Sequence, residues 1–170
     1  TMPTDWTMES IHLDDLDIDT ARALLVNGMN QGTALVTYTG HSEPIEWSFS
    51  SLFTKQMAAN LTNQGKPFVV VQWGCWNTYY VDPVNNYLVQ SFLFSGDRGA
   101  AAVLGATTLS EVISEQMLGQ LLTPKLATPG MFIGDAVQQA KAELGATHPE
   151  MLDVLLGWSL MGDPALVIAP

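Results

Sequence analysis

Three short apolar segments constrain the fold of this chain more than any other feature. Residues 34–41, 67–75 and 99–106 are rich in β-branched, aromatic or small side chains, and Gly, Asn or Pro bound them. Short continuous apolar runs are typical of strands that are buried on both faces of a parallel sheet. The stretch between the first two runs has a helical pattern, so we expect a right-handed crossover between parallel strands. The sequence thus predicts an α/β fold with a largely parallel sheet.

Helical patterns and turn residues fill the remainder of the chain. An acidic, polar leader precedes the first helix, and residues 42–49 and 76–83 are predicted to be loops. The predicted helices are residues 20–28, 51–63, 84–94, 110–122, 132–144 and 149–156, the last with Thr147 as its N-cap, and a short strand is predicted within residues 162–168.

Size and charge restrict the functional classes. The 170 residues, 47% of them hydrophobic, suit one globular domain with a sizeable core. Six Lys and Arg against 17 Asp and Glu give a formal charge of -11, which repels phosphate backbones and anionic lipid heads. Apolar stretches are also far shorter than the roughly 20 residues of a membrane span. We therefore expect neither a nucleic-acid nor a membrane partner.

Two of the predicted strands end on residues that can perform chemistry. The first delivers His41, and the second delivers Cys75, the only cysteine of the chain. In open parallel sheets, ligands bind at the carboxyl ends of the strands, where both residues fall. A cysteine or histidine at a strand end is often only packing, but the two together at neighbouring strand ends favour a catalytic pair. Gly40 and Gly74 directly precede them and permit sharp turns.

Metal sites have little support in the sequence. His12, His41 and His148 are scattered and have no cysteine partner at zinc-ligand spacing. Four aspartates lie just before the first predicted helix, at positions 14, 15, 17 and 19. Capping of the helix N-terminus is the simpler interpretation, and a structural calcium ion is the alternative, although the glycine and distal glutamate of an EF-hand loop are missing. We predict no cofactor.

Five segments of the chain occur in a specific order: VTYTGH (36–41) with Trp47 nearby, PFVVVQWGC (67–75), RGAAAVLG (98–105), IGDA (133–136) and LMGDPAL (160–166). In this order they resemble the catalytic half of gingipain-like cysteine peptidases. The resemblance implies a caspase-like three-layer α/β sandwich and a cysteine endopeptidase that acts on protein or peptide substrates. It implies that Cys75 is the nucleophile and His41 the general acid/base, and that residues 1–170 are the C-terminal, catalytic portion of one peptidase domain.

The resemblance also assigns a substrate pocket. In that family, the residues two before the histidine and two before the cysteine line the specificity pocket, and here they are Thr39 and Trp73. Trp76 and other aromatic residues of the following loop could enlarge an apolar pocket or seal the core. A basic substrate side chain would require a carboxylate. Glu43, Glu46, Asp82 and Glu111 are candidates for it, although each could equally be a solvated charge or a helix cap.

Two features depart from the family pattern. Ser42 follows His41 where the family usually has glycine, so the oxyanion would meet the backbone N–H groups of Cys75 and Ser42. The family also has two strands and an acidic residue upstream of the histidine strand. We therefore expect an N-terminal segment or a companion chain to complete the sheet. By analogy, the protein is expected to be secreted, periplasmic or at the cell surface of a bacterium.

Two other functions remain open at this stage. A catalytically inactive relative could bind peptides or a partner protein through the same cleft, although the presence of both His41 and Cys75 argues against it. A metal-dependent hydrolase is remote, because no ligand cluster is evident.

Overall fold

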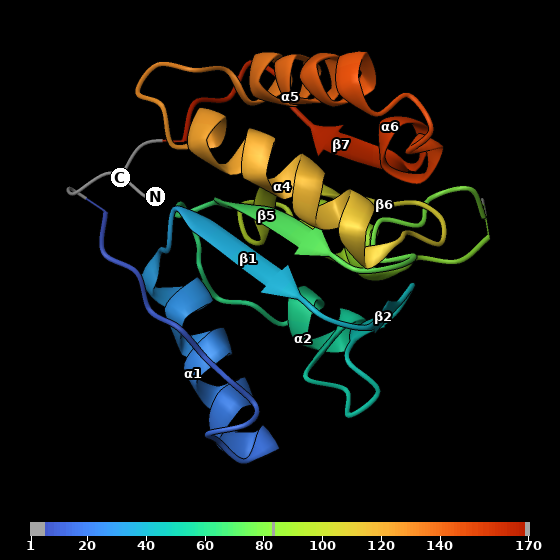
Figure 1. The fold of residues 1–170 in the computed structure, drawn as a ribbon. Helices are drawn as coiled ribbons and strands as arrows, with labels where there is room; N and C mark the ends of the chain where they lie inside the picture. The colour runs from blue at the N-terminus through green and yellow to red at the C-terminus, as the bar shows by residue number, and fades with distance from the viewer. Residues whose placement is uncertain (1–5, 83, 169–170) are drawn as a thin grey trace.

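A four-stranded sheet forms the centre of the molecule (Figure 1). In this computed structural model, which describes residues 6–82 and 84–168, the strand order is β1 (Leu35–Thr39), β5 (Phe68–Trp73), β6 (Ala100–Ala106) and β7 (Trp158–Gly162). The first three strands are parallel, and β7 is antiparallel to β6. The three predicted strands and their parallel arrangement are confirmed.

Helices cover both faces of this sheet (Figure 1). Helices α1 (Ile18–Gln31), α2 (Lys55–Ala59) and α3 (Leu88–Leu93) contribute to the apolar cluster on one face, and α4 (Val112–Leu126), α5 (Ile133–Thr147) and α6 (Leu152–Gly157) contribute to the cluster on the other. The result is a three-layer α/β sandwich. Among the described residues, no helix has the length and apolarity that a bilayer crossing requires.

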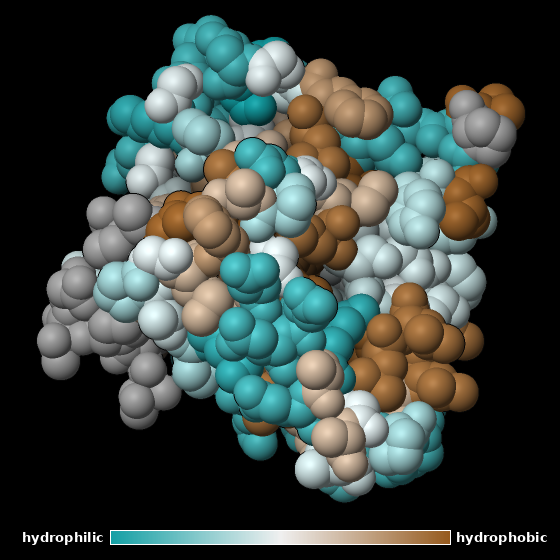
Figure 2. Space-filling model, turned by 90° about the horizontal axis from the view of Figure 1, so that it is seen from above, coloured by the Kyte–Doolittle hydropathy of each residue, from teal (hydrophilic) through white to brown (hydrophobic). Residues whose placement is uncertain are grey.

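The outer surface has an uneven distribution of apolar side chains. Seen from above, the largest hydrophobic areas lie towards the end of the molecule to which β1 and β5 point (Figure 2). Leu109, Val112 and Ile113, which are about two thirds exposed, occur where the chain enters α4 after leaving β6. The carboxyl ends of the strands thus adjoin apolar surface.

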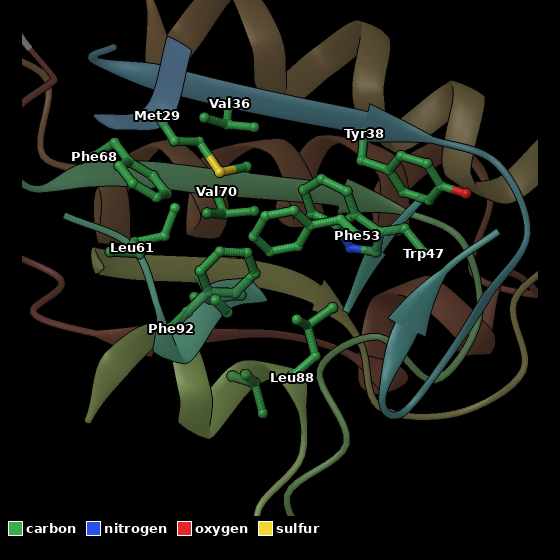
Figure 3. Packing of buried hydrophobic residues seen from close by; sticks show 14 of the residues in the cluster. Met29, Val36, Tyr38, Trp47, Phe53, Leu61, Phe68, Val70, Leu88 and Phe92 are labelled. Atoms are coloured by element: carbon green, nitrogen blue, oxygen red, sulfur yellow. The ribbon is translucent and has the colours of Figure 1, made fainter. Parts of the chain in front are cut away.

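Strand β5 connects the two cores of the molecule. All six of its residues are buried, as expected for a central parallel strand. Because successive side chains alternate, Phe68 and Val70 enter one apolar cluster, and Val69 and Val71 enter the other. Figure 3 shows the first cluster, in which Phe68 and Val70 lie among Met29 of α1, Leu88 and Phe92 of α3, and the rings of Trp47 and Phe53.

Residues 42–54 differ from the prediction. A small antiparallel sheet forms from β2 (Ser42–Glu43), β3 (Glu46–Trp47) and β4 (Phe53–Thr54), where we expected a loop followed by the start of a helix. Trp47 and Phe53 are partners in this sheet, and both are fully buried. Their burial favours strand pairing over helix, so α2 starts only after Thr54, whose hydroxyl accepts the Met57 N–H as an N-cap.

Other element boundaries also differ from the prediction. Strand β7 covers residues 158–162, where no strand was predicted, and Gly162, whose φ is 123°, ends it. The predicted turn and short strand of residues 162–168 are present as a turn and an isolated antiparallel bridge from Val167 to Phe132. Thr147 is the last residue of α5 and not the cap of the next helix, because its hydroxyl bonds back to the carbonyls of Glu143 and Leu144. Helix α3 starts at Leu88 rather than at residue 84.

The acidic leader caps α1. One carboxylate oxygen of Asp17 accepts the N–H groups of Asp19 and Thr20, and the other accepts the Thr20 hydroxyl. These bonds, above all that from the Thr20 side chain, lower the pKa of Asp17. The capping interpretation is confirmed. Within residues 6–82 and 84–168, no group of three or more His, Cys, Asp or Glu side chains could hold a metal ion.

Candidate active site

His41 and Cys75 lie at the same end of two neighbouring strands. Strands β1 and β5 are paired in register up to Thr39 and Trp73, and the Gly40 N–H donates to the Trp73 carbonyl at 2.9 Å. His41 and Cys75 therefore follow their strands at equal distances. Both line one cavity of about 430 Å³. The sequence placed these residues at strand ends, and the structure brings them to one cavity.

The cavity has walls from β1, β5 and α4. Its lining residues are Thr39, Gly40, His41, Trp73, Gly74, Cys75, Ser110, Val112, Glu115, Gln116 and Gly119. Thr39 and Trp73, the expected pocket residues, are among them. The ring of Trp73 stacks on that of Trp158, with 4.4 Å between the centroids, and this contact fixes its orientation. Glu43 lies exposed on β2, Trp76 packs edge-on against Tyr79, and neither lines the cavity.

Gly74 allows the two strand ends to approach closely. A Cβ atom at this position would lie 2.2 Å from the Gly40 carbonyl oxygen and 2.6 Å from Ser42 Oγ. Neither contact is possible for a real side chain, so any other residue would force the two turns apart. The glycine before Cys75 is thus required by the close approach to the His41 turn.

A buried polar network supports the Cys75 turn. The fully buried Asn77 donates through Nδ2 to the Gly74 carbonyl at 2.7 Å and to Ser42 Oγ at 3.1 Å, and its Oδ1 accepts the Ala106 N–H at 3.0 Å. Ser42 Oγ donates in turn to the Cys75 carbonyl at 2.7 Å. The network ties β2, the Cys75 turn and the end of β6 together. Sequence analysis missed this role of Asn77 because two of its partners, Ser42 and Ala106, are about 30 residues away in the chain.

The Cys75 thiol is half-buried and lies against Ser110. Its Sγ is 3.6 Å from the Ser110 carbonyl oxygen and 3.8 Å from Ser110 Oγ. The Ser110 hydroxyl donates to Glu115 Oε1 at 2.5 Å. A carboxylate, a hydroxyl and the thiol therefore lie in a row along the α4 wall of the cavity.

Glu115 is an acidic residue of the cavity that sequence analysis did not select. It is 8% exposed, and burial raises its pKa, although hydrogen bonds from Ser110 and from the Gly74 N–H oppose the shift. The helical spacing of the sequence could have indicated that Glu115 is buried. Glu115 precedes Leu118 by three residues and Leu122 by seven, so it shares their buried helix face.

The four acidic candidates from the sequence all lie outside the lining of the cavity. Glu46 accepts the Ser51 hydroxyl, and Asp82 accepts bonds from Val84, Asn85 and Tyr87 that lower its pKa to about 2. Glu43 and Glu111 are exposed.

The His41 turn has a different environment. The His41 carbonyl accepts the Tyr38 hydroxyl at 2.5 Å and the Ser48 N–H at 2.7 Å. The imidazole stacks on the ring of Phe49, with 4.9 Å between centroids and 23° between planes. Ser42, expected to offer an oxyanion N–H, is a buried residue of β2 opposite Trp47. Its predicted role stays a prediction.

A three-layer α/β sandwich that joins a histidine and a cysteine at adjacent strand ends has the arrangement of a cysteine peptidase. The chain belongs to peptidase family C25, whose family model matches residues 1–169. This is a cysteine peptidase family, and the resemblance seen in the sequence is confirmed.

Solved structures show the same fold. The chain is similar to a complex of the pro- and mature domains of RgpB from Porphyromonas gingivalis, with a TM-score of 0.72 and 19% identity over 86% of this chain and 37% of that chain. It is also similar to the Arg-specific cysteine proteinase gingipain R (RgpB), with a TM-score of 0.68 and 19% identity over 86% and 36% of the two chains. A further protease matches with a TM-score of 0.64 and 15% identity, over 84% and 37%.

These matches establish the fold as caspase-like. This chain spans little more than a third of each of the RgpB chains. A comparison with curated proteins finds no match.

Proposed function

We propose that this chain carries the catalytic pair of a cysteine endopeptidase, with Cys75 as nucleophile and His41 as general acid/base. The observation that supports the proposal is the shared cavity of about 430 Å³ that both residues line at the ends of β1 and β5. The half-buried thiol is open to this cavity, as a nucleophile must be.

The reaction proceeds in two stages. The Cys75 thiolate attacks the scissile carbonyl carbon, a C–S bond forms, and the carbonyl electron pair moves to oxygen, where the Cys75 N–H and a neighbouring amide stabilise the charge. When the C–N bond breaks, the His41 imidazolium gives its proton to the leaving amine. Neutral His41 then takes a proton from water as the oxygen attacks the acyl carbon. A C–O bond forms, the C–S bond breaks, the carboxylic acid leaves, and the Cys75 thiolate and the His41 imidazolium are regenerated.

Active-site labelling tests this function. A peptide acyloxymethyl ketone should label native protein at Cys75, the only thiol of the chain, with one equivalent of peptide per chain. Alkylation of the urea-unfolded protein by iodoacetamide gives the total amount of thiol with which this labelling is compared. His41→Ala should abolish peptide hydrolysis and slow the labelling, whereas Cys75→Ala should abolish both. Native protein that neither hydrolyses peptides nor reacts at Cys75 would overturn the proposal and favour an inactive peptide-binding relative.

A basic side chain is the proposed specificity at the cleavage site. Glu115 is the one carboxylate among the residues that line the cavity, and Trp73 and Val112 offer apolar walls for an aliphatic stem. A similar structure is described as that of an Arg-specific proteinase. Glu115→Gln should lower kcat/KM for Arg or Lys substrates by about 10- to 100-fold, the value of a charge-assisted hydrogen bond, and should affect an apolar substrate much less.

Glu43→Gln is the matched control, because Glu43 carries the same charge outside the cavity. Equal losses for basic and apolar substrates in Glu115→Gln would contradict the assigned specificity.

A companion segment is the proposed partner of β1. Within the described residues, β1 pairs with β5 alone, so its other edge is open. A groove of about 480 Å³ lies along β1, between α1 and the end of α4, with Leu24, Leu35 and Leu126 in its walls, and leader residues between Trp6 and Ile11 also line it. An open strand edge in an apolar groove is a template for strand addition, and the RgpB chains are almost three times as long as the stretch matched here.

Amide exchange tests the companion segment. The β1 amides that do not bond to β5 should exchange quickly in the isolated 170-residue chain and slowly in a longer polypeptide that contains the segment. A monodisperse monomer of the isolated chain whose β1 amides are all protected would refute this partner.

Export to the bacterial periplasm, to the cell surface or out of the cell is the proposed localisation, on the basis of membership in family C25. Fractionation of the source cells tests it, and exclusive recovery in the cytoplasm would contradict it.

A further inference from the structure

Phe49 is an exposed aromatic residue with a specific contact. Its side chain is 74% exposed, yet its ring stacks on the His41 imidazole at 4.9 Å. A phenyl group left this open to water contributes little to folding, because most of its surface is not removed from solvent. The hydrogen bonds formed by residues 6–82 and 84–168 include none to the imidazole of His41, so this stack is its principal fixed contact.

The turn that carries Phe49 has an unfavourable backbone. Ser48 and Ser51 have φ values of 60° and 55°, in the left-handed region that residues with a Cβ rarely adopt. Local hydrogen bonds hold it there. The Ser48 N–H donates to the His41 carbonyl at 2.7 Å, and the Ser51 N–H donates to the Ser48 carbonyl at 3.1 Å. The turn is thus attached to the residue on which Phe49 stacks.

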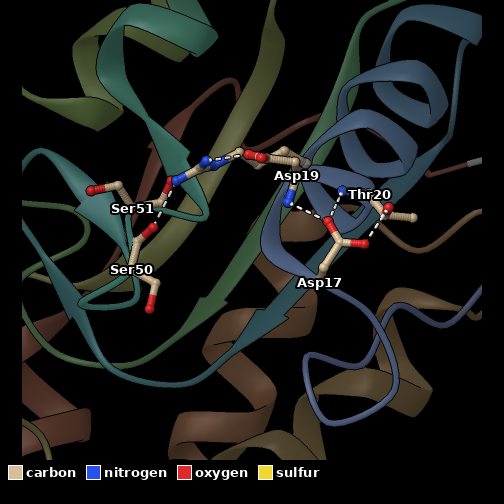
Figure 4. Close-up of polar contacts among 6 residues, drawn as sticks. Asp17, Asp19, Thr20, Ser50 and Ser51 are labelled. Atoms are coloured by element: carbon tan, nitrogen blue, oxygen red, sulfur yellow. Dashed lines mark hydrogen bonds and ion pairs between the residues drawn. The ribbon is translucent and has the colours of Figure 1, made fainter.

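Arg22 of α1 supplies a second attachment. Its Nε donates to the Ser51 carbonyl at 3.0 Å and its Nη2 donates to the Ser50 carbonyl at 2.7 Å, while Nη1 pairs with Asp19 at 2.8 Å. Figure 4 shows this arrangement, with the guanidinium between the capped start of α1 and the serine carbonyls. A strained turn held by a distant helix indicates that its conformation has a function.

We propose that Phe49 is a positioning residue for His41. The phenyl face sets the plane of the imidazole and stabilises the imidazolium that forms when the Cys75 proton is transferred, because a cation within about 6 Å of an aromatic ring centroid is attracted to its face. Arg22 holds the turn in the required place. The catalytic part of this inference rests on the proposed peptidase function, and the stacking itself does not.

Three variants test the role. Phe49→Leu removes the aromatic face and Phe49→Tyr retains it. Phe94→Leu is the matched control, because Phe94 is also 74% exposed but lies at the end of α3 and does not stack on His41. Phe49→Leu should remove the ring-current shift of the His41 imidazole protons in NMR spectra. It should also slow alkylation of Cys75 by iodoacetamide at neutral pH about two- to fivefold, the range of an exposed cation–π contact. Phe49→Tyr should restore both values, and Phe94→Leu should change neither.

Steady-state kinetics separate positioning from substrate contact. Phe49→Leu should lower kcat with little change in KM, since a residue that orients the base acts after binding. A higher KM with unchanged alkylation would show that Phe49 only contacts substrate, and unchanged imidazole shifts would show that the stack does not exist in solution; either result overturns the inference. If the parent protein hydrolyses no peptide, the proposed function fails, whereas altered shifts and alkylation in Phe49→Leu still support positioning.

Discussion

The turns that carry Cys75 and His41 are built in opposite ways. The Cys75 turn rests on buried groups, since Asn77 has no exposed surface and bonds to Gly74, Ser42 and Ala106. The His41 imidazole instead stacks on Phe49, which is 74% exposed and whose turn depends on a bond network that includes the surface residue Arg22. The comparison teaches that the position of the nucleophile is a property of the core, while that of the base depends on the surface. Substitutions at the first turn should affect stability, and those at the second should affect chemistry.

Asn77→Leu should cause the largest loss. The substitution leaves the Gly74 carbonyl and the Ala106 N–H buried without their partner, at about 1–3 kcal/mol for each group, so the free energy of unfolding should fall by about 3–5 kcal/mol. Urea denaturation measures it. Asn86→Ala, at an exposed site, should stay within about 0.5 kcal/mol. Equal changes in the free energy of unfolding for Asn77→Leu and Asn86→Ala would contradict the conclusion that the buried bonds of Asn77 stabilise the Cys75 turn.

Gly74→Ala should be the next most harmful change. Its methyl group would meet the Gly40 carbonyl, so the His41 and Cys75 turns must separate, with a loss of about 2–3 kcal/mol and a large loss of Cys75 labelling by peptide probes. Gly65→Ala is the control, because Gly65 also has a positive φ of 69° but no neighbour within 4 Å of a new Cβ. A Gly74→Ala protein with the stability of Gly65→Ala would show that close approach is unimportant.

Glu115 gives the stability a pH dependence of predictable sign. Burial raises its folded pKa above the ordinary 4.5, so the folded state keeps a proton that the unfolded state has lost as pH rises through this window. Stability therefore declines with rising pH there, and the charged form remains destabilising above it. Relative to the parent, Glu115→Gln should become more stable in urea titrations as pH rises above the ordinary pKa of 4.5, and the difference should level off once the folded protein has lost its proton. A stability difference that is independent of pH would contradict the assignment.

Arg22→Gln should have the smallest effect on stability. Arg22 lies partly at the surface, and its pair with the 84% exposed Asp19 side chain should contribute less than about 1 kcal/mol. Alkylation of Cys75 should slow, but less than in Phe49→Leu, because the turn loosens without losing its aromatic ring. Thermal unfolding and iodoacetamide kinetics on the same samples measure both effects. Alkylation of Arg22→Gln that is as fast as that of the parent would refute the role of Arg22 in holding the turn.

Much of the fold could be predicted from local patterns. The runs that became β5 and β6 are apolar apart from Gln72, and a parallel strand buried on both faces needs that pattern. The run that became β1 contains Thr37 and Thr39, which are exposed, as is typical of a strand at the edge of a sheet. The positions of His41 and Cys75 at strand ends followed from the same runs. The small sheet of β2, β3 and β4 could not be predicted in this way, because its strands have only two residues each and are stabilised by the burial of Trp47 and Phe53 in a core built by other segments.

The surroundings of the catalytic pair could be predicted only in part. Thr39 and Trp73 line the cavity as expected, because they are the last residues of β1 and β5. Glu43 and Trp76 are just as close in sequence but face elsewhere, since β2 pairing and the turn after Cys75 direct them away. Short distance along the chain did not decide which side chains reach the cavity.

The sequence by itself determined the class of fold, the parallel strands and the two residues at their ends, because burial patterns and turn residues act over a few neighbouring positions. Only the tertiary structure decided that Glu115 enters the cavity, that Asn77 supports the Cys75 turn and that Phe49 and Arg22 hold the His41 side. The physical reason is that their roles depend on partners from other elements, as when Arg22 reaches Ser50 across 28 residues of chain. Such contacts exist only once the sheet has assembled and brought those elements together.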